Sequence, residues 1–214
     1  MADTKSSMKS LKAYEKIRDM VLSGHKLPGT RLVLSELETE LNIGRGPIRE
    51  AIMRLDRSGL VKNIPYKGAI VATPPTKKEV LHIYDLRMDL EANLAVEAMD
   101  NLTNAHITTL EELHSTMGEL PHNHYHFDRQ FHYHIYSASN LPHLCNIAQT
   151  LIFSVESVLN IYHWEKKHCL KFNTQHQAII DALKTKDPAR VKKTIKINIK
   201  SGLEIIKETY AKML

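Results

Sequence analysis

The sequence predicts a mainly α-helical protein with two domains: three helices plus a β-hairpin at the N-terminus, and an all-α helical bundle at the C-terminus. Apolar residues recur at helical spacing through most of the 214 residues. Strand-like runs separated by a turn stand out across residues 60–72, and a stiff proline-containing segment follows them. We therefore predict an N-terminal domain over residues 1–73, a linker over 74–78 and a helical domain over 79–214.

Three helices are expected before the hairpin. The first is predicted over residues 11–23, and the second is expected to start at Ser35, because Ser35 and Glu38 have the spacing of a capping box. The third is expected to begin at Pro47, since the missing N–H costs nothing at the first helical position, and to end at Gly59. Their apolar faces are expected to be buried and consist of Leu11, Tyr14, Ile17, Val21, Leu37, Leu41, Ile48, Ala51, Ile52 and Leu55.

The hairpin is predicted from two short apolar runs, residues 60–64 and 69–72, joined by the turn Pro65-Tyr66-Lys67-Gly68. Three helices followed by a hairpin make a winged helix-turn-helix. The turn residues would form the tip of its wing.

The C-terminal domain shows helical spacing throughout, with no strand pattern. Thr76 and Glu79 predict a capped first helix, and Asp187 followed by Pro188 predicts the start of a last long helix. Breaks near residues 101–104, 118–123, 140–142 and 184–188 divide the domain into about six helices, which would pack as a bundle.

The composition, 43% hydrophobic and 25% charged, is typical of a soluble globular protein. No apolar run reaches the ~20 residues that a transmembrane helix needs, and the first residues lack the apolar core of a secretory signal. Two cysteines are too few for a disulfide framework. We therefore expect a cytoplasmic protein with no membrane partner.

The net charge of +5 comes from the first third of the chain, because residues 1–76 hold 13 Lys and Arg against 8 Asp and Glu. A basic domain attracts polyanions. Arg45 and Arg49 are four residues apart, so they share one helix face, opposite the apolar stripe. An arginine there can bind guanine in the major groove, although spacing alone also fits solvated surface charges.

Four further residues of this domain are candidates for contacts with double-stranded DNA. Gly46 lacks a side chain between the two arginines and would let the backbone approach closely. Ser35, near a helix N-terminus, could contact a phosphate. Lys67 and Gly68 in the wing turn could reach the neighbouring minor groove or phosphates.

Residues from about 10 to 73, above all the run from Leu27 to Val61, resemble the DNA-binding domain of GntR-family bacterial transcription regulators. The most specific parts of the resemblance are the runs PGTRL (28–32), RGPIREA (45–51) and LDRSGL (55–60). Around Arg45 the chain departs from the family, which more often has Ser or Thr at the two flanking positions. The resemblance implies a homodimer that reads a palindromic operator, as paired helix-turn-helix units do.

In the helical domain, Asp128 and His132 are four residues apart and so point the same way from one helix. A carboxylate and an imidazole on one face could form half of a site for a divalent metal. The spacing equally fits a surface hydrogen bond, because residues 122–134 contain five histidines.

From about residue 78 the chain also resembles the helical ligand-binding domain of the FadR-type (FCD) branch of the same family. The resemblance rests on Leu86-Arg87 with Leu90-Glu91, on Asp128 with Phe131-His132, on Ser139-Asn140, and on His176 with Asp187. Many members bind a metal with one Asp and three His, whereas others use the pocket without one.

The resemblance implies that Asp128, His132 and His176 bind a divalent ion of the zinc, nickel or manganese type. The fourth ligand position falls at Asn198, where an amide replaces the third imidazole and would bind more weakly. Arg87, on a helix face with Tyr84 and Glu91, is the candidate contact for a small organic acid effector. An Arg87–Glu91 salt bridge along the helix is the alternative.

These features favour a ligand-responsive DNA-binding transcription regulator, commonly a repressor, and not an enzyme. A metal-dependent enzyme built on the Asp–His cluster is the main rival, although the chain has no HExxH element. A winged helix that binds protein or RNA is a third reading.

Overall fold

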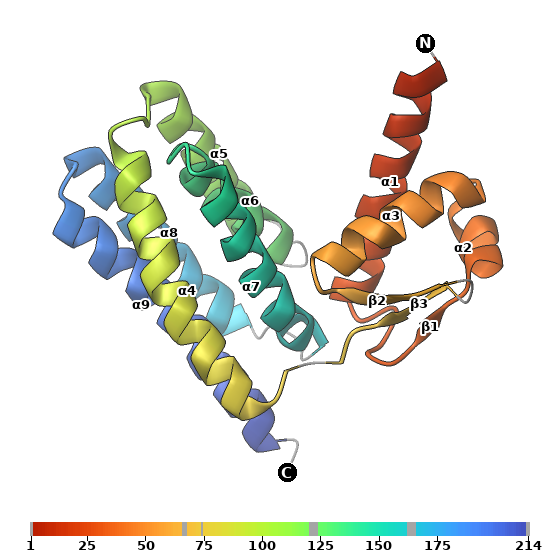
Figure 1. The fold of residues 1–214 in the computed structure, drawn as a ribbon. Helices are drawn as coiled ribbons and strands as arrows, with labels where there is room; N and C mark the ends of the chain where they lie inside the picture. Colours follow the sequence, from red (N-terminus) through yellow and green to blue (C-terminus); the bar gives the residue numbers. More distant parts are fainter. Residues whose placement is uncertain (1, 66–67, 74, 120–123, 162–165, 213–214) are drawn as a thin grey trace. The chain divides into compact units, whose positions relative to one another are not determined.

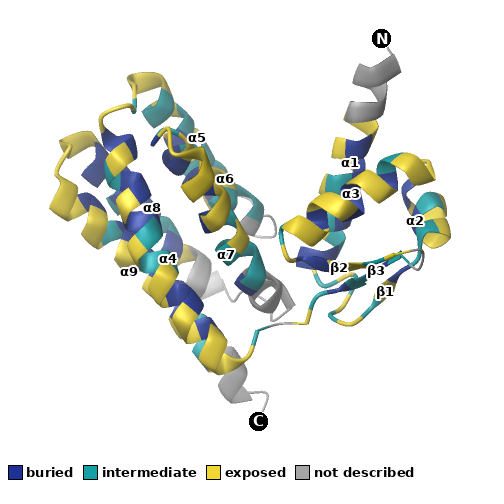
Figure 2. Cartoon of the chain, in the orientation of Figure 1, coloured by how far each residue is buried: buried dark blue, intermediate teal, exposed yellow. Residues whose placement is uncertain are grey.

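The computed structural model describes residues 2–65, 68–73, 75–119, 124–161 and 166–212, and side chains at some of the segment ends are not described. The chain divides into two compact units. One comprises residues 1–75 with 153–161, and the other comprises residues 76–152 with 162–214. Figures 1 and 2 show the elements of each unit and the burial of their residues.

The N-terminal unit is a winged helix-turn-helix, as predicted. Its three helices are α1 (Ala2–Leu22), α2 (Leu34–Leu41) and α3 (Arg45–Arg57). Its strands are β1 (Arg31–Leu32), β2 (Val61–Ile64) and β3 (Gly68–Val71), which form an antiparallel sheet in the order β1-β3-β2 (Figure 1). The central strand β3 therefore pairs with both others, and Ile70 faces Arg31 on one side and Lys62 on the other.

The core of this unit lies between α1, α3 and the sheet. The predicted stripe of α3 is buried, and Leu37 and Leu41 of α2 pack into the same core. One expectation fails in α1: Leu11 is 47% exposed, whereas Ala13 is fully buried, so the apolar face of α1 lies beside the predicted one. The buried members of the core are Ala13, Ile17, Val21, Leu22, Leu32, Leu37, Leu41, Ile43, Ile48, Ala51, Ile52, Leu55, Leu60, Val61, Ala69 and Val71.

The predicted capping box at Ser35 is wrong. Helix α2 begins at Leu34, its N-cap is Val33, and no side chain caps it. Ser35 therefore lies inside the first turn. The third helix also begins earlier than predicted, at Arg45, so that Pro47 is its third residue. Proline is tolerated there because the first four N–H groups of a helix have no partner within the helix.

The end of α3 follows the prediction. Gly59 adopts a φ of +75°. Its N–H bonds the Asp56 carbonyl at 3.0 Å, and the Leu60 N–H bonds the Leu55 carbonyl at 3.1 Å. This pair of bonds is the Schellman motif, which ends a helix with glycine in the left-handed region. The chain is thereby turned from α3 into the hairpin.

Gly68 is required where β3 starts beside β1. Its φ is +90°, and a Cβ at this position would collide with the Leu32 carbonyl oxygen. The two-residue strand β1 is too short to show a periodicity, so the sequence did not predict it. Because β1 pairs with β3 directly after Gly68, the wing is anchored to the core by a backbone contact that admits no side chain.

Six helices follow residue 76 in the described part of the chain, and they form the C-terminal unit except for residues 153–161, the end of the fourth of them, which belong to the other unit. They are α4 (Lys77–Met99), α5 (Asn104–Glu119), α6 (His124–Ser137), α7 (Pro142–Ile161), α8 (Lys166–Thr185) and α9 (Pro188–Lys212). The predicted caps are confirmed: Thr76 accepts from the Glu79 N–H, and Asp187 accepts from Ala189 and Arg190.

Helix α4 packs along α9 and also contacts α6, while α8 packs between α5 and α9. The buried residues of these helices are coloured dark blue in Figure 2. Helices α4, α6 and α8 carry the buried polar residues Glu91, His132 and His176, respectively. None of the described helices combines the length and apolar character needed to cross a membrane.

We predict that Gly68→Ala destabilises the N-terminal unit by about 1–3 kcal/mol, because alanine is strained at positive φ and its Cβ meets the Leu32 carbonyl. Calorimetry of the full chain would show the transition of this unit at a lower temperature. Gly46→Ala is the matched control, since a Cβ at Gly46 meets no atom within 4 Å. Equal transition temperatures for the two variants would contradict the role of Gly68.

Candidate functional site

The first candidate site is the exposed face of α3. Arg45 and Arg49 lie at its first position and one turn later, and both are exposed. The opposite face carries Ile48 and Leu55, which are fully buried. Gly46 lies between the arginines and borders open space. The face therefore offers two guanidinium groups around a patch of accessible backbone, a surface suited to the base edges of a major groove.

Arg45 has a partner that the sequence did not suggest. Its Nε donates to Glu38 Oε2 at 2.7 Å, across the turn that joins α2 to α3. The two side chains are 59% and 39% exposed, so the ion pair contributes at most ~1 kcal/mol. It orients the guanidinium without burying it. Glu38, predicted to close a capping box, instead points toward the next helix.

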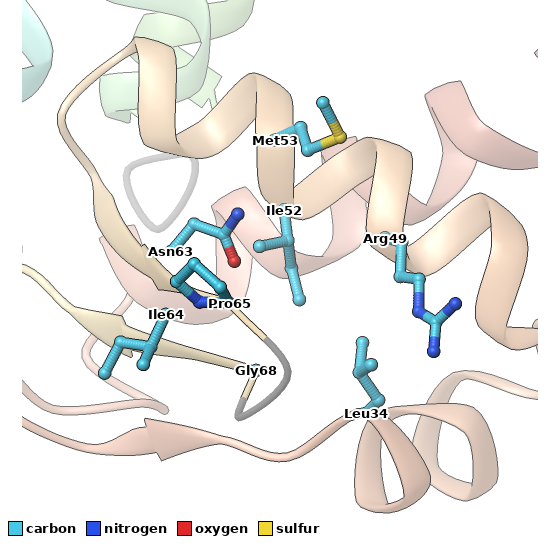
Figure 3. A pocket seen from close by; sticks show the side chains of 8 residues that line it. All are labelled: Leu34, Arg49, Ile52, Met53, Asn63, Ile64, Pro65 and Gly68. Atoms are coloured by element: carbon cyan, nitrogen blue, oxygen red, sulfur yellow. The ribbon is translucent and has the colours of Figure 1, made fainter.

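A cleft of about 410 Å³ is lined by residues of α3, of the hairpin and of the start of α2. Figure 3 shows Ile52 and Leu34 reaching into the space between α3 and the strands, with Arg49 on its α3 side. Gly68 lines the same cleft, so the structure brings two of the predicted DNA-contacting residues to one hollow. Ser35 is exposed on α2. Lys67, the predicted wing contact, lies outside the described residues.

The second candidate site is a cluster of three side chains within the bundle. Asp128 and His132 come from α6, and His176 comes from α8. One donor atom from each lies within 4.8 Å of the others. Asp128 Oδ1 is 3.0 Å from His176 Nε2 and 3.9 Å from His132 Nε2. His176 is fully buried and Asp128 is 25% exposed, so the carboxylate marks the side of the cluster open to solvent.

The donor set fits a divalent metal. One carboxylate and two imidazoles are ligands that zinc, nickel and manganese accept, and three such ligands leave positions for water or another anion. Burial lowers the pKa of His132, with the neighbouring His176 adding to the effect and Asp128 opposing it. His132 is consequently neutral at pH 7, the form in which imidazole binds metals.

The fourth predicted ligand, Asn198, is buried on α9. Its amide nitrogen points to the Gln175 side chain, at 3.4 Å from Oε1. Gln175 in turn donates to Ser201 at 2.8 Å. The structure therefore brings together Asp128, His132 and His176. The amide nitrogen of Asn198 is hydrogen-bonded to Gln175, the residue before His176.

Behind His132 lies a chain of buried polar groups. His132 Nδ1 is 3.0 Å from the Tyr136 hydroxyl, and that hydroxyl donates to Glu91 Oε2 at 2.8 Å. Glu91, fully buried on α4, accepts from Arg87 Nε at 2.6 Å. Burial, reinforced by the charge of Glu91, raises the pKa of Tyr136 well above its ordinary value, so the phenol keeps its proton.

Arg87 thus has an anionic partner in its own helix, as the salt-bridge alternative proposed. The pair is buried rather than superficial, since the Arg87 side chain is 11% exposed. Burial alone would lower the pKa of Arg87, but the charge of Glu91 outweighs it and the pKa is raised. The guanidinium also stacks over the Tyr84 ring, 4.8 Å from its centroid.

Sequence reasoning named Glu91 only as a salt-bridge partner of Arg87, and it missed Tyr136 and the contact of Tyr136 with Glu91. The available signals were the position of Glu91 seven residues after Tyr84, on the buried face of α4, and the position of Tyr136 one turn after His132. Both signals are weak without knowledge that α4 and α6 meet.

Two family models match the chain. Residues 9–71 match the model described as bacterial regulatory proteins, gntR family, and residues 82–200 match the FCD domain, which alone covers more than half of the chain. The chain is a GntR-family regulator with an FCD domain. This confirms the resemblance that the sequence indicated.

The similar proteins are regulators of the same kind. The chain is 26% identical over 220 residues to the HTH-type transcriptional repressor GlaR of Escherichia coli (strain K12), covering 94% of this chain and 97% of that protein. It is 25% identical over 204 residues to the HTH-type transcriptional regulator YdhC of Bacillus subtilis (strain 168), with 92% and 90% covered.

Among solved structures, Escherichia coli McbR/YncC has the same fold, with a TM-score of 0.83 at 22% identity over 94% of this chain and 98% of that one. A GntR regulator from Rhodococcus sp. RHA1 gives a TM-score of 0.74 at 18% identity, over 94% and 98% of the two chains. The named relatives are transcription regulators, so this GntR-family chain is a regulator and not the metal-dependent enzyme considered as its rival.

We predict that Arg87→Met lowers the stability of the helical unit by about 3–5 kcal/mol, because it leaves the buried Glu91 carboxylate without its cation. The double variant Arg87→Met/Glu91→Met should recover most of this loss, since no charge then remains unpaired. Calorimetric unfolding of the three proteins measures the difference. A single variant as stable as the unsubstituted protein would show that the pair does not govern the stability of this unit.

Proposed function

We propose that this GntR-family regulator is a homodimeric repressor that reads a palindromic operator with Arg45 and Arg49 and responds to a small carboxylate bound in its FCD domain. The observation that supports this most directly is the exposure of both arginines on one face of α3, opposite the buried stripe. A helix that reads the major groove needs its arginines together on one exposed face, whereas solvated surface charges can lie anywhere on the surface.

In this proposal the N-terminal end of α3 enters the major groove. The Arg45–Glu38 pair occupies Nε, so the terminal nitrogens of Arg45 form the fork that can bind guanine O6 and N7. Arg49 contacts a neighbouring base or phosphate, Gly46 allows close approach, and Ser35 presents its hydroxyl to a phosphate. Lys67 and Gly68 at the wing contact the adjacent groove.

The dimer and the palindrome are proposed from the logic of helix-turn-helix proteins. One recognition helix spans too few base pairs to be specific, and two related by a two-fold axis read symmetric half-sites. Repression is proposed because the similar GlaR is named a transcriptional repressor.

The effector site is proposed at Asp128, His132 and His176, the residues that would hold a divalent ion, with Asn198 of the last helix proposed as a weaker fourth ligand. Such an ion, when bound, supplies a Lewis-acidic position for a carboxylate oxygen. Arg87, whose Nε is engaged by Glu91, offers its terminal nitrogens to the same anion. The ligand shifts operator affinity only if it binds two arrangements of the dimer unequally.

The DNA proposal is tested with Arg45→Ala. A randomised duplex library first selects the sequence preferred by the unsubstituted protein, and gel-shift titrations then compare that duplex with one altered at each guanine. We expect Arg45→Ala to lose about 1–3 kcal/mol of discrimination at one base pair. Lys67→Ala should instead weaken all duplexes alike.

Arg57→Ala is the matched control for Arg45→Ala, because it removes the same charge from the exposed last turn of α3. It should leave the base preference intact. If Arg45→Ala keeps the full preference of the unsubstituted protein, α3 does not read the groove as proposed.

The metal proposal is tested by substituting the fourth position. Asn198→His would supply the imidazole that the family resemblance implies at this position, and we expect zinc affinity to rise at least about tenfold over the unsubstituted protein. Asp128→Asn should lower it. Competition with a chromophoric chelator measures both. If Asp128→Asn leaves the zinc affinity unchanged, any bound zinc lies at another site.

A further inference from the structure

The two nitrogens of the His132 ring face different surroundings. Nδ1 lies 3.0 Å from the Tyr136 hydroxyl, within hydrogen-bond distance. Nε2 faces Asp128 at 3.9 Å, which is too long for a hydrogen bond. The ring is therefore held through Nδ1 and presents Nε2 to the cluster.

The numbers of donors and acceptors between Arg87 and His132 determine which atom carries each hydrogen. The Glu91 carboxylate is paired with Arg87, so it is ionised and only accepts hydrogen bonds. Tyr136 has one proton and donates it to Glu91 at 2.8 Å. The Tyr136 oxygen can then only accept from its other neighbour, which is His132 Nδ1. His132 must carry its proton on Nδ1, and its lone pair is left on Nε2.

The other tautomer is disfavoured by the same contacts. A proton on Nε2 would place the Nδ1 lone pair against an oxygen lone pair of Tyr136 at 3.0 Å, with no hydrogen between them. Both groups are buried, so water cannot relieve that repulsion. If the Tyr136 hydroxyl rotated to donate to His132, Glu91 Oε2 would lose its hydrogen bond from Tyr136.

We propose that Tyr136, held by Glu91 and Arg87, is a positioning residue that fixes His132 in the tautomer whose Nε2 lone pair points at Asp128 and His176. The inference rests on the proposed metal site, because this tautomer is the one in which Nε2 can bind a divalent ion. It adds a residue to that site that touches no ligand itself and acts through His132. Hydrogen-bond partners of metal-binding histidines typically change metal affinity by about 10–100-fold.

The first test reads the tautomer in the full, metal-free chain. Protein labelled with ¹⁵N-histidine gives long-range ¹⁵N–¹H correlation spectra that distinguish the protonated ring nitrogen from the one with a lone pair. The His132 signals are identified by their loss in His132→Gln. We expect Nδ1 to be protonated, and a proton found on Nε2 would overturn the proposal without any further variant.

The second test removes the hydroxyl. Tyr136→Phe should weaken zinc binding by about 10–100-fold and give His132 a mixture of tautomers in the same spectra. Tyr133→Phe is the matched control, because Tyr133 lies on the same helix and is 51% exposed. It should change neither measurement. Zinc affinity in Tyr136→Phe equal to that of the Tyr133→Phe control would overturn the positioning role.

Failure of this inference is distinguishable from failure of the metal site. If Asp128→Asn abolishes zinc binding while Tyr136→Phe leaves it unchanged, the site stands and the role of Tyr136 is wrong. If neither variant affects zinc binding, the metal site itself is wrong. Should Tyr136→Phe fail to fold, the tautomer measurement on the unsubstituted chain still decides the proposal.

Discussion

The interior of the helical unit depends on one buried charge, the carboxylate of Glu91. An ionised carboxylate removed from water is tolerated only when its oxygens are paired. Arg87 pairs with one oxygen from the same helix, and Tyr136 donates to the other from α6. Because Tyr136 also holds His132, the placement of α6 against α4 and the orientation of the imidazole follow from the same requirement. A single desolvated group thus links the packing of two helices to the geometry of the candidate metal site.

The sequence predicted best those features that act within a few residues of chain. Thr76 and Asp187 cap their helices as expected, since each side chain reaches N–H groups three or fewer residues ahead. Gly59 ends α3 for a similarly local reason. The same reasoning failed at Ser35 and Glu38, where the residue types and spacing were equally good. There the Glu38 carboxylate found a cation on the next helix, and a partner in tertiary structure replaced the local one.

The residues of the candidate sites also fall into those that local spacing predicts and those that depend on tertiary packing. The shared faces of Arg45 with Arg49, and of Asp128 with His132, follow from helical spacing alone. His176 came from the family resemblance, because nothing local brings α8 to α6. Glu91 and Tyr136 are separated by 45 residues, and their contact exists only once α4 and α6 pack. The strand β1 escaped prediction for the same reason, since two residues show no periodicity and the strand exists through its pairing with β3.

The charges around the cluster bear on how a carboxylate effector and a metal would relate. Asp128 and Glu91 contribute two carboxylates, Arg87 contributes one guanidinium, and the field of Arg87 reaches His132. The two carboxylates outnumber the one guanidinium, and this excess of negative charge repels an anion. A divalent cation reverses that sign, so in the proposed function each ligand favours the other. Such coupling is reciprocal by thermodynamic necessity. In the proposed function Arg87 offers its terminal nitrogens to the anion although Glu91 offsets much of its charge, and it also holds the carboxylate that pairs with Tyr136.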